Sequence, residues 1–281
     1  MRDIDVNEIG ARVRQAVQDI NMHTPQPTLI QLNNILETEP SPAGRQAMRD
    51  IVVNRAIASE RQVPMCQDTG MAIVFIELGQ EVHLIGGDLR EAINQGVRDG
   101  YREGYLRKSV VAEPLFERMN TRDNTPAVVH VDVVPGEGVK LIVAAKGFGA
   151  ENMSWARILT PAAGIEGVKR EVVRCVEEAG PNACPPMVVG VGLGGTLEMA
   201  ALLAKKALMR EIGTRNPDAR YAALELELLD LVNATGIGPQ GWGGVNTALD
   251  VRVEFFATHI AAIPIAINLD CHLQRHMEIA I

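Results

Sequence analysis

The sequence predicts a mixed α/β fold of the α+β kind, a single large domain of helices packed around mixed β-sheets that covers residues 1–281. Two observations predict it. Apolar residues recur at helical spacing through the first part of the chain, and short strand-like runs then alternate with further helical patterns. Hydrophobic residues make up 47% and charged residues 22% of the chain, which is typical of a globular protein. We expect a helical N-terminal part, about 1–62, and a mixed α/β part, about 63–281.

The N-terminal part is expected to form three helices. The first is indicated by an apolar stripe at helical spacing, formed by Ile9, Val13, Val17 and Ile20. Pro25 and Pro27 end this pattern, and further helical patterns follow at 29–36 and at about 43–58. Pro64 and Gly70 then interrupt the helices, and the apolar run 71–78 predicts a buried strand.

The middle of the chain mixes turns, strands and helices. Gly86 and Gly87 mark a turn, after which Asp88 is placed to cap a helix. The strand-like runs 127–134 and 140–146 are separated by a Pro-Gly segment, which predicts a hairpin or adjacent strands. The pattern from 155 to 178 is helical and stops at Ala-Gly-Pro.

The last third begins with a buried strand, a glycine turn and a helix capped by Thr196. Helices are expected over 197–213 and 220–236, followed by a glycine-dense loop. The run 249–256 alternates strictly, with apolar residues on one face and Asp250, Arg252 and Glu254 on the other. This alternation predicts a half-buried strand.

Charge and hydropathy exclude several classes of protein. The chain has 35 acidic and 27 basic residues, and a formal net charge of −8 argues against broad binding to nucleic acid. No apolar run approaches the roughly 20 residues that span a bilayer. The polar N-terminus lacks the apolar centre of a signal peptide. We therefore expect a cytoplasmic protein with no nucleic-acid or membrane partner.

The four cysteines fall into two groups. Cys175 lies on an apolar helical stripe and is expected to be a core residue. Cys66, Cys184 and Cys271 lie in breaks between helices and strands, beside polar residues. They are either three unrelated thiols or a metal site, and no CxxC pair indicates a zinc finger. Three thiolates suit a [4Fe–4S] cluster with one open iron better than a closed zinc site, and a catalytic zinc is the alternative.

Two glycine segments have the composition of anion-binding turns. GVGLGG, residues 190–195, formally matches GxGxxG, but the acidic residue expected after a second strand is missing, so a nucleotide site is the weaker alternative. In KGFGAENMS, residues 146–154, Lys146, Asn152 and the backbone at Gly147 and Gly149 have the chemistry to bind a carboxylate. An ordinary strand-to-helix loop explains the same residues.

Taken together, several segments resemble a known family. They are PMCQDTGMAIVF, YLRKSVV, RDNTPAVVH, KGFGAENMS, AGPNACPPMVVGVGLGGT and INLDCHLQRH. These segments resemble the alpha subunit of two-chain class I fumarate hydratase, an iron–sulfur-dependent hydro-lyase, and the related alpha subunit of L(+)-tartrate dehydratase. The similarity runs from about residue 51 to residue 271.

The resemblance implies a metal centre and a substrate pocket. Cys66, Cys184 and Cys271 match the ligands of a [4Fe–4S] cluster whose open iron acts as a Lewis acid. Five further residues match the substrate pocket: Gln67 and Asp68 beside the cluster, Arg107 on a substrate carboxylate, Gly149 as a backbone contact, and His259, twelve residues before the last cysteine. Asp68 and His259 would handle protons. In the Gly149 turn this chain has Phe148 where the family has glycine.

The resemblance also implies an activity and partners. The expected reaction is the reversible hydration of fumarate to L-malate, with L(+)-tartrate dehydration as the alternative and a metal-stabilised assembly scaffold as the non-enzymatic one. This chain ends ten residues after Cys271, whereas single-chain members continue into a second domain. We therefore expect a beta subunit that carries the remaining active-site residues, including the base, and an alpha–alpha contact within a heterotetramer. His272, Arg275 and His276 are expected at an interface or facing solvent.

Overall fold

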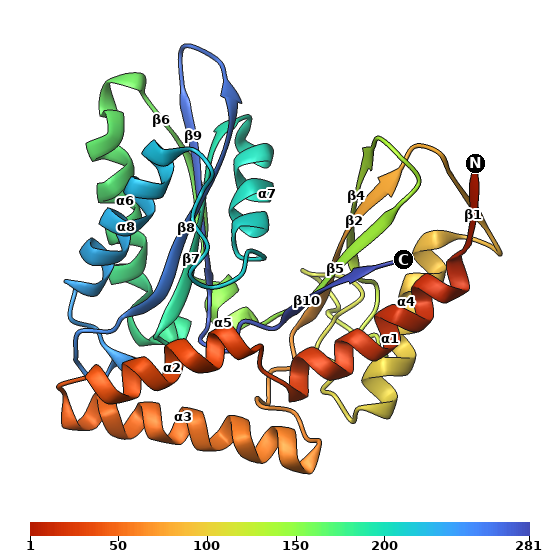
Figure 1. Ribbon diagram of the computed structural model, residues 1–281, viewed down its shortest axis with the longest axis horizontal. Helices are drawn as coiled ribbons and strands as arrows, with labels where there is room; N and C mark the ends of the chain where they lie inside the picture. The colour runs from red at the N-terminus through yellow and green to blue at the C-terminus, as the bar shows by residue number, and fades with distance from the viewer. The chain divides into compact units, whose positions relative to one another are not determined.

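The computed structural model describes all residues, 1–281. Its contacts group them into two compact units. Unit 1 consists of Met1–Thr24, Arg55–Phe148 and Arg275–Ile281, and unit 2 of Pro25–Asn54 and Gly149–Gln274. Helices pack on β-sheets in both units (Figure 1), and the predicted mixed α/β class is confirmed.

Unit 1 is a helix-covered sheet. Its elements are β1 (Arg2–Asp5), α1 (Val6–Met22), β2 (Met71–Gly79), β3 (Val82–Ile85), α4 (Leu89–Glu103), β4 (Val128–Val134), β5 (Val139–Lys146) and β10 (His276–Ala280). The main sheet has the order β10-β5-β2-β4, and β1 pairs with β3 in a small second sheet. The predicted apolar stripe of α1 is buried against β5 and against α4, which lies alongside α1 (Figure 1). The Asp88 cap is confirmed, since its carboxylate accepts the N–H of Glu91 at 2.9 Å.

Unit 2 is a sheet covered on both faces. Its elements are α2 (Gln26–Thr38), α5 (Phe148–Glu151, from its second residue), β6 (Trp155–Leu159), α6 (Gly164–Ala179), β7 (Met187–Gly195), α7 (Leu197–Ala207), α8 (Ala219–Asn233), β8 (Ala248–Thr258) and β9 (Ile263–Asp270). Helix α3 (Pro42–Arg61) belongs to unit 2 as far as Asn54. The sheet order is β6-β9-β7-β8. Helices α6 and α8 bury one face and α7 the other (Figure 1).

The two sheets share one strand plan. In each, a central strand (β2 or β7) pairs in parallel with one neighbour (β4 or β8) and antiparallel with the other (β5 or β9). Because antiparallel strands run in opposite directions, the start of β2 lies beside the end of β5, and the start of β7 beside the end of β9. The predicted site residues lie in chain segments next to these strand ends: Cys66 and Asp68 precede β2, Cys184 precedes β7, and Cys271 follows β9.

The predicted hairpin between 127–134 and 140–146 is wrong, because β2 separates the two strands. Backbone N–H groups at the end of β2 bind the connecting segment: Gly79 donates to Gly138 at 2.9 Å and Glu81 donates to Gly136 at 3.0 Å. The apolar residues of β2 are buried through most of the strand, whereas most of β4 is partly or fully exposed. Burial of β2 thus decides the strand order.

Two further expectations need correction. Residues 155–159 form the edge strand β6 rather than the start of a helix, and helix α6 begins only at Gly164. In the GVGLGG segment, Gly190 and Gly192 are strand residues of β7, where a Cβ atom would collide with the carbonyl oxygens of Ala204 and Ala200. These glycines therefore serve close packing of α7 on β7.

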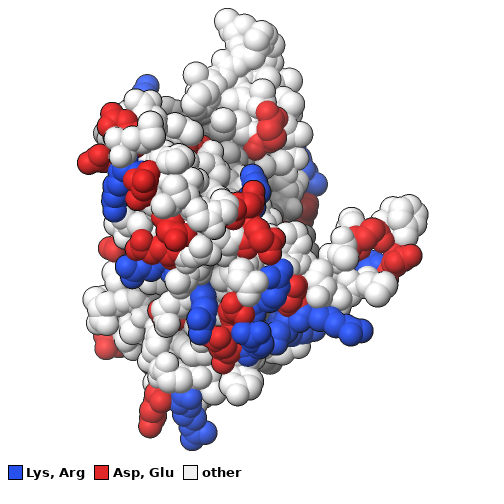
Figure 2. All heavy atoms as spheres, turned by 90° about the vertical axis from the view of Figure 1, so that its right-hand side faces the viewer, with Lys and Arg blue, Asp and Glu red and all other residues white.

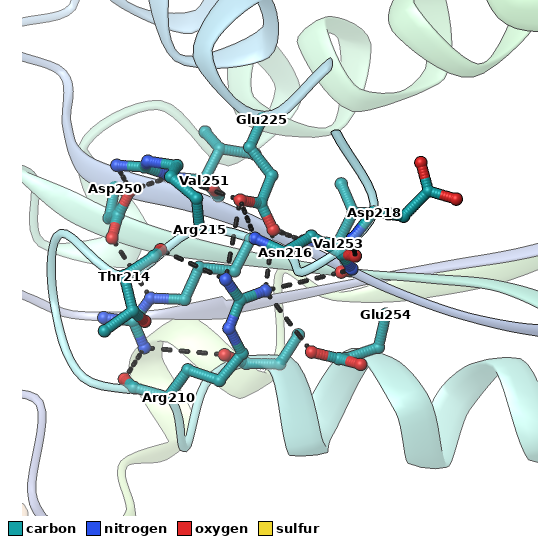
Figure 3. A network of polar contacts seen from close by, with 12 residues as sticks. Arg210, Thr214, Arg215, Asn216, Asp218, Glu225, Asp250, Val251, Val253 and Glu254 are labelled. Carbon is teal, nitrogen blue, oxygen red and sulfur yellow. Dashed lines mark hydrogen bonds and ion pairs between the residues drawn. The ribbon is translucent and has the colours of Figure 1, made fainter. Parts of the chain in front are cut away.

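Two of the three residues on the charged face expected for the strand 249–256 are buried, and the third, Glu254, is half-buried. Asp250 and Arg252 are each 0% exposed, and they form an ion pair at 3.2 Å between the Oδ2 and Nε atoms. Arg215 also pairs with Asp250, at 2.7 Å, while Arg210 pairs with buried Glu225, at 2.7 Å (Figure 3). Burial lowers the pKa of Arg252 to about 10, so this side chain stays charged at neutral pH. The predicted strand is therefore confirmed as β8, but the expected exposure of its charged side is wrong at Asp250 and Arg252, because these paired charges satisfy one another.

Opposite charges also pair on the surface of unit 1. Arg14 contacts Glu103 at 2.7 Å and Arg98 contacts Asp123 at 3.0 Å. Figure 2 shows a face on which acidic and basic side chains are interspersed. No helix combines the length and the apolar character needed to cross a membrane.

Candidate functional site

The first candidate region is the CQDTG loop of unit 1, which leads into β2. Cys66 and Asp68 are half-buried there, and Gln67 is exposed. One carboxylate oxygen of Asp68 accepts the N–H of Gly70 at 3.0 Å, and the other accepts the N–H of Phe148 at 2.8 Å. Asp68 therefore joins the start of β2 to the KGFG turn after β5, so two motifs quoted separately from the sequence form one structure.

The guanidinium group of Arg275 binds the backbone of this loop. Its Nη1 atom donates to the carbonyl oxygen of Asp68 at 2.6 Å and to Oδ1 of Asn21 at 2.9 Å. Its Nη2 atom lies 2.9 Å from where a Cβ atom would stand on Gly147, so glycine makes room for the guanidinium. Arg275 is only 4% exposed, which corrects the expectation that it faces solvent; His272 and His276 are half-buried.

Arg107 is held close to the same loop through its backbone. The hydroxyl of Thr69 donates to the Arg107 carbonyl oxygen at 3.0 Å, and the Arg107 side chain is exposed. The hydroxyl of Tyr101 donates to the carbonyl oxygens of Thr69 at 2.8 Å and Gly70 at 2.9 Å. Burial raises the pKa of Tyr101, so it remains a neutral donor. The structure thus brings Arg107, Asp68 and Gln67 together in one unit.

Gly70 is the tightest point of the loop, and replacing it should be strongly destabilising. Its φ angle is +77°, and an added Cβ atom would lie 2.8–2.9 Å from the backbone of Ala145 and Lys146. We expect Gly70→Ala to lower the free energy of unfolding by about 2–4 kcal/mol, measured by chemical denaturation. Gly138→Ala is the matched control, since a Cβ atom there meets nothing within 4 Å. Equal stability of the two variants would contradict this account.

The second candidate region lies in unit 2, where β7 begins and β9 ends. Cys184 precedes β7 and Cys271 follows β9, and the N–H of His272 donates to the Cys184 carbonyl oxygen at 3.4 Å. Both cysteines are half-buried and neither forms a disulfide. Cys184 has a φ angle of +55°, a left-handed conformation that is uncommon for a residue with a side chain. Such strained positions cluster at functional sites.

Polar contacts hold the surroundings of these two cysteines in place. The carbonyl oxygen of Pro185 accepts hydrogen bonds from the N–H of Gln240 at 2.9 Å and from its side-chain amide at 2.6 Å. Glu151, two residues after Gly149, accepts from Lys205 and from Asn268 of β9. Gly149 is exposed at the start of unit 2, in the short helix α5. Glu151 therefore links helix α5 to β9 close to the end of the strand that precedes Cys271.

Cys175 is distinct from the other cysteines. It is 2% exposed, and its thiol donates to the carbonyl oxygen of Met153 at 3.5 Å. Burial raises the pKa of this thiol to about 12, so it is protonated at neutral pH and is a poor metal ligand. The prediction that Cys175 is a core residue is confirmed.

His259 lies at the other end of β9 from Cys271. It is exposed in the loop between β8 and β9, where its Nδ1 atom accepts the N–H of Ala261 at 3.2 Å. Strand β9 has eight residues, which at about 3.3 Å per residue separates its ends by roughly 25 Å. His259 and Cys271 therefore lie at opposite ends of an extended strand of this chain, and the role of His259 in a substrate pocket stays a prediction.

Within either unit, no three His, Cys, Asp or Glu side chains form a group able to hold a metal ion. Unit 1 contains Cys66, and unit 2 contains Cys184 and Cys271.

Comparison with known proteins assigns the family. The family described as fumarate hydratase (Fumerase) matches residues 11–280. The chain belongs to this fumarate hydratase family. The predicted enzyme class, a hydro-lyase, is confirmed by this membership.

Individual relatives of this chain are known as well. A protein of Methanocaldococcus jannaschii, provisionally named L(+)-tartrate dehydratase subunit alpha, is 38% identical to this chain, and the match covers 95% of each of the two chains. The L(+)-tartrate dehydratase subunit alpha of Escherichia coli strain UTI89 is 32% identical over 96% of this chain and 89% of its own length. The protein of that name from strain K12 is 31% identical over the same shares.

Several supporting residues were not foreseen from the sequence. Arg275, Tyr101 and Gln240 all bind backbone carbonyl groups of the two candidate regions. Each lies far in sequence from the groups that it holds, so only long-range contacts reveal the role. A partial signal exists for Arg275, since it follows Cys271 closely in a chain segment with two histidines.

Proposed function

We propose that this chain is the alpha subunit of a two-chain hydro-lyase that, with a beta subunit, catalyses the reversible hydration of fumarate to L-malate. The observation that carries the proposal is the family match over residues 11–280. Dehydration of L(+)-tartrate is the second candidate, favoured by the names of the relatives. The same names support a beta subunit, since they describe subunits alpha.

We propose that Cys66, Cys184 and Cys271 ligate a [4Fe–4S] cluster. The donor set supports this, because all three thiols are half-buried in loops and none is in a disulfide, while Cys175 is a protonated core thiol. When bound, a cluster held by three cysteines supplies an iron with an open position that polarises a substrate oxygen.

The substrate would be bound by groups of this chain around the cluster. The exposed guanidinium of Arg107 has the fork geometry to hold a carboxylate, and Gln67 and the Gly149 backbone supply further hydrogen bonds. Each Asp68 oxygen accepts one backbone N–H and retains a second lone pair. Asp68 can therefore accept a hydrogen bond or proton from a substrate hydroxyl, whereas the base that acts at carbon belongs to the beta subunit.

The deciding experiment is anaerobic co-expression with the beta subunit, followed by assays with fumarate and with L(+)-tartrate and by iron, sulfide and EPR analysis. We expect activity with fumarate and an EPR signal that changes when substrate is added. Arg107→Ala should raise KM for the dicarboxylate while the iron content stays unchanged. Activity with tartrate alone would select the second candidate. Zinc without iron, or no activity with either substrate, would favour the assembly scaffold.

A further inference from the structure

The glycine-dense loop between α8 and β8, residues 234–247, lies beside Cys184 in unit 2, and the proposed reaction gives it no role. Gln240 in this loop holds the residue that follows Cys184. Its backbone N–H and its side-chain amide both donate to the carbonyl oxygen of Pro185, at 2.9 Å and 2.6 Å. Through these two bonds the loop contacts the segment that leads from Cys184 into β7.

The segment after Cys184 has few other ways of being held. Proline has no backbone N–H, so Pro185 and Pro186 can form backbone hydrogen bonds only through their carbonyl groups. The two bonds from Gln240 thus fix the first carbonyl group after Cys184. Cys184 itself has a φ angle of +55°, a conformation that costs stability and persists only where the surrounding structure holds it. Gln240 supplies part of that hold.

The loop is in turn fixed by Glu39, which lies between α2 and α3 and is fully buried. The Glu39 carboxylate accepts the backbone N–H groups of Val245 and Asn246, both at 3.2 Å, and the side-chain amide of Asn246 at 2.8 Å. A Cβ atom on Gly244 would collide with this carboxylate, so glycine allows its close approach. Because a buried carboxylate is costly unless hydrogen bonds satisfy it, Glu39 and the loop hold each other in place.

Glu39 and Cys184 belong to the same end of the sheet. Helices α2 and α3 pack near the starts of β7 and β8 (Figure 1). One buried apolar cluster there joins Leu32 of α2 and Ile51 of α3 to Val188 of β7. A continuous set of contacts therefore runs from Glu39 through the loop to the residue after Cys184.

We propose that Gln240 is a positioning residue for the Cys184 thiol, and that Glu39 acts with it by fixing the loop 234–247. Loosening either contact frees the Pro185 carbonyl group, after which Cys184 can leave its left-handed conformation and turn its thiol away. The inference rests on the proposed function in naming the cluster as the group that this thiol binds. The position of the thiol in the metal-free chain does not depend on that function.

The test measures how fast iodoacetamide alkylates each cysteine of the folded, metal-free full chain, with the sites resolved by peptide mass spectrometry. Cys175 is 2% exposed in the core of unit 2, so its alkylation reports global unfolding. Gln240→Met keeps the length of the side chain and removes its donor. Cys184 in this variant should react about 5-fold faster than in the wild type, the factor that one net hydrogen bond represents, while the rate at Cys175 stays unchanged.

Glu39→Gln tests the far end of the same set of contacts. It places an amide group where the N–H groups of Val245 and Asn246 need an acceptor. The variant should show the same selective increase at Cys184, although Gln240 is unchanged.

Thr235→Val is the matched control within the loop. It removes a hydroxyl that contacts Val232 and Thr247 and has no bond to Pro185. The alkylation rate of Cys184 should stay within about two-fold of the wild type, because contacts that share no partner act independently.

The same variants are then compared in the anaerobically purified complex. Gln240→Met should release iron to a chelator about 5-fold faster and should change the shape of the EPR spectrum, whereas Thr235→Val should do neither. Equal Cys184 alkylation rates in Gln240→Met and the wild type would overturn the proposal. Equal acceleration at Cys184 and Cys175 would overturn it too, by assigning Gln240 a merely structural role. A wild-type complex without iron would contradict the proposed cluster, while the alkylation rates would still decide whether Gln240 positions Cys184.

Discussion

Cys184→Ser and Cys271→Ser are each expected to remove most of the bound iron and to lower hydro-lyase activity by more than about 100-fold. Loss of a residue that only supports a metal ligand already costs about 10–100-fold, and loss of a ligand should cost more. Cys66→Ser should behave in the same way. The measurements are iron and sulfide content of the anaerobically purified complex, its EPR spectrum and its activity.

Cys175→Ser is the matched control for these three variants. The serine hydroxyl can keep the hydrogen bond to the Met153 carbonyl oxygen, and the thiol that it replaces is protonated and buried. We expect iron content and activity within about two-fold of the wild type, with some loss of stability from burying a more polar group. Iron loss in Cys175→Ser equal to that in the other variants would refute the assignment of ligands.

Glu225→Ala is expected to produce the largest loss of stability in unit 2. Glu225 is fully buried, pairs with Arg210 and accepts the backbone N–H groups of Asn216 and Val253 at 3.0 Å and 2.9 Å. Removing Glu225 leaves the N–H groups of Asn216 and Val253 without this acceptor and Arg210 with Glu254 as its remaining carboxylate, and losing one partner of a buried pair costs about 3–5 kcal/mol. The melting temperature, measured by circular dichroism, should fall by on the order of 10 °C.

Glu227→Ala controls for removal of a nearby carboxylate on the same helix. Glu227 is 50% exposed and pairs with Lys169 on the surface. Exposed pairs contribute about 0–1 kcal/mol, so this variant should unfold close to the wild-type temperature. A Glu225→Ala variant as stable as Glu227→Ala would show that the network in Figure 3 adds nothing to stability.

The buried network also marks a limit of sequence analysis. Strict alternation over 249–256 predicts one solvent-facing side, yet Asp250 and Arg252 are buried because Arg215 and the backbone around Leu208 bind them. Those partners lie about 40 residues earlier in the chain. Alternation describes only how side chains point from a strand, and it says nothing of what later covers the polar side.

Strand order shows the same limit. The helices α1, α2, α3 and α4 and the strand β2 were predictable, because each rests on the spacing of apolar residues within one segment. The Pro-Gly segment 135–138 has the composition of a hairpin turn, yet β2 inserts between the strands that it connects. Pairing depends on which strand buries the most apolar surface, and that competition involves segments far apart in sequence.

By itself, the sequence determined the helical and strand segments named above and the family, because neighbouring residues encode periodicity and motifs directly. It also determined that Cys175 is a helix residue of the core, whereas the other three cysteines lie in loops. Only the tertiary structure decided that Cys184 lies beside the segment of Cys271, that Asp68 binds the KGFG turn, and that His259 lies at the far end of β9. These relations follow from the order and direction of strands in a sheet, which long-range burial sets.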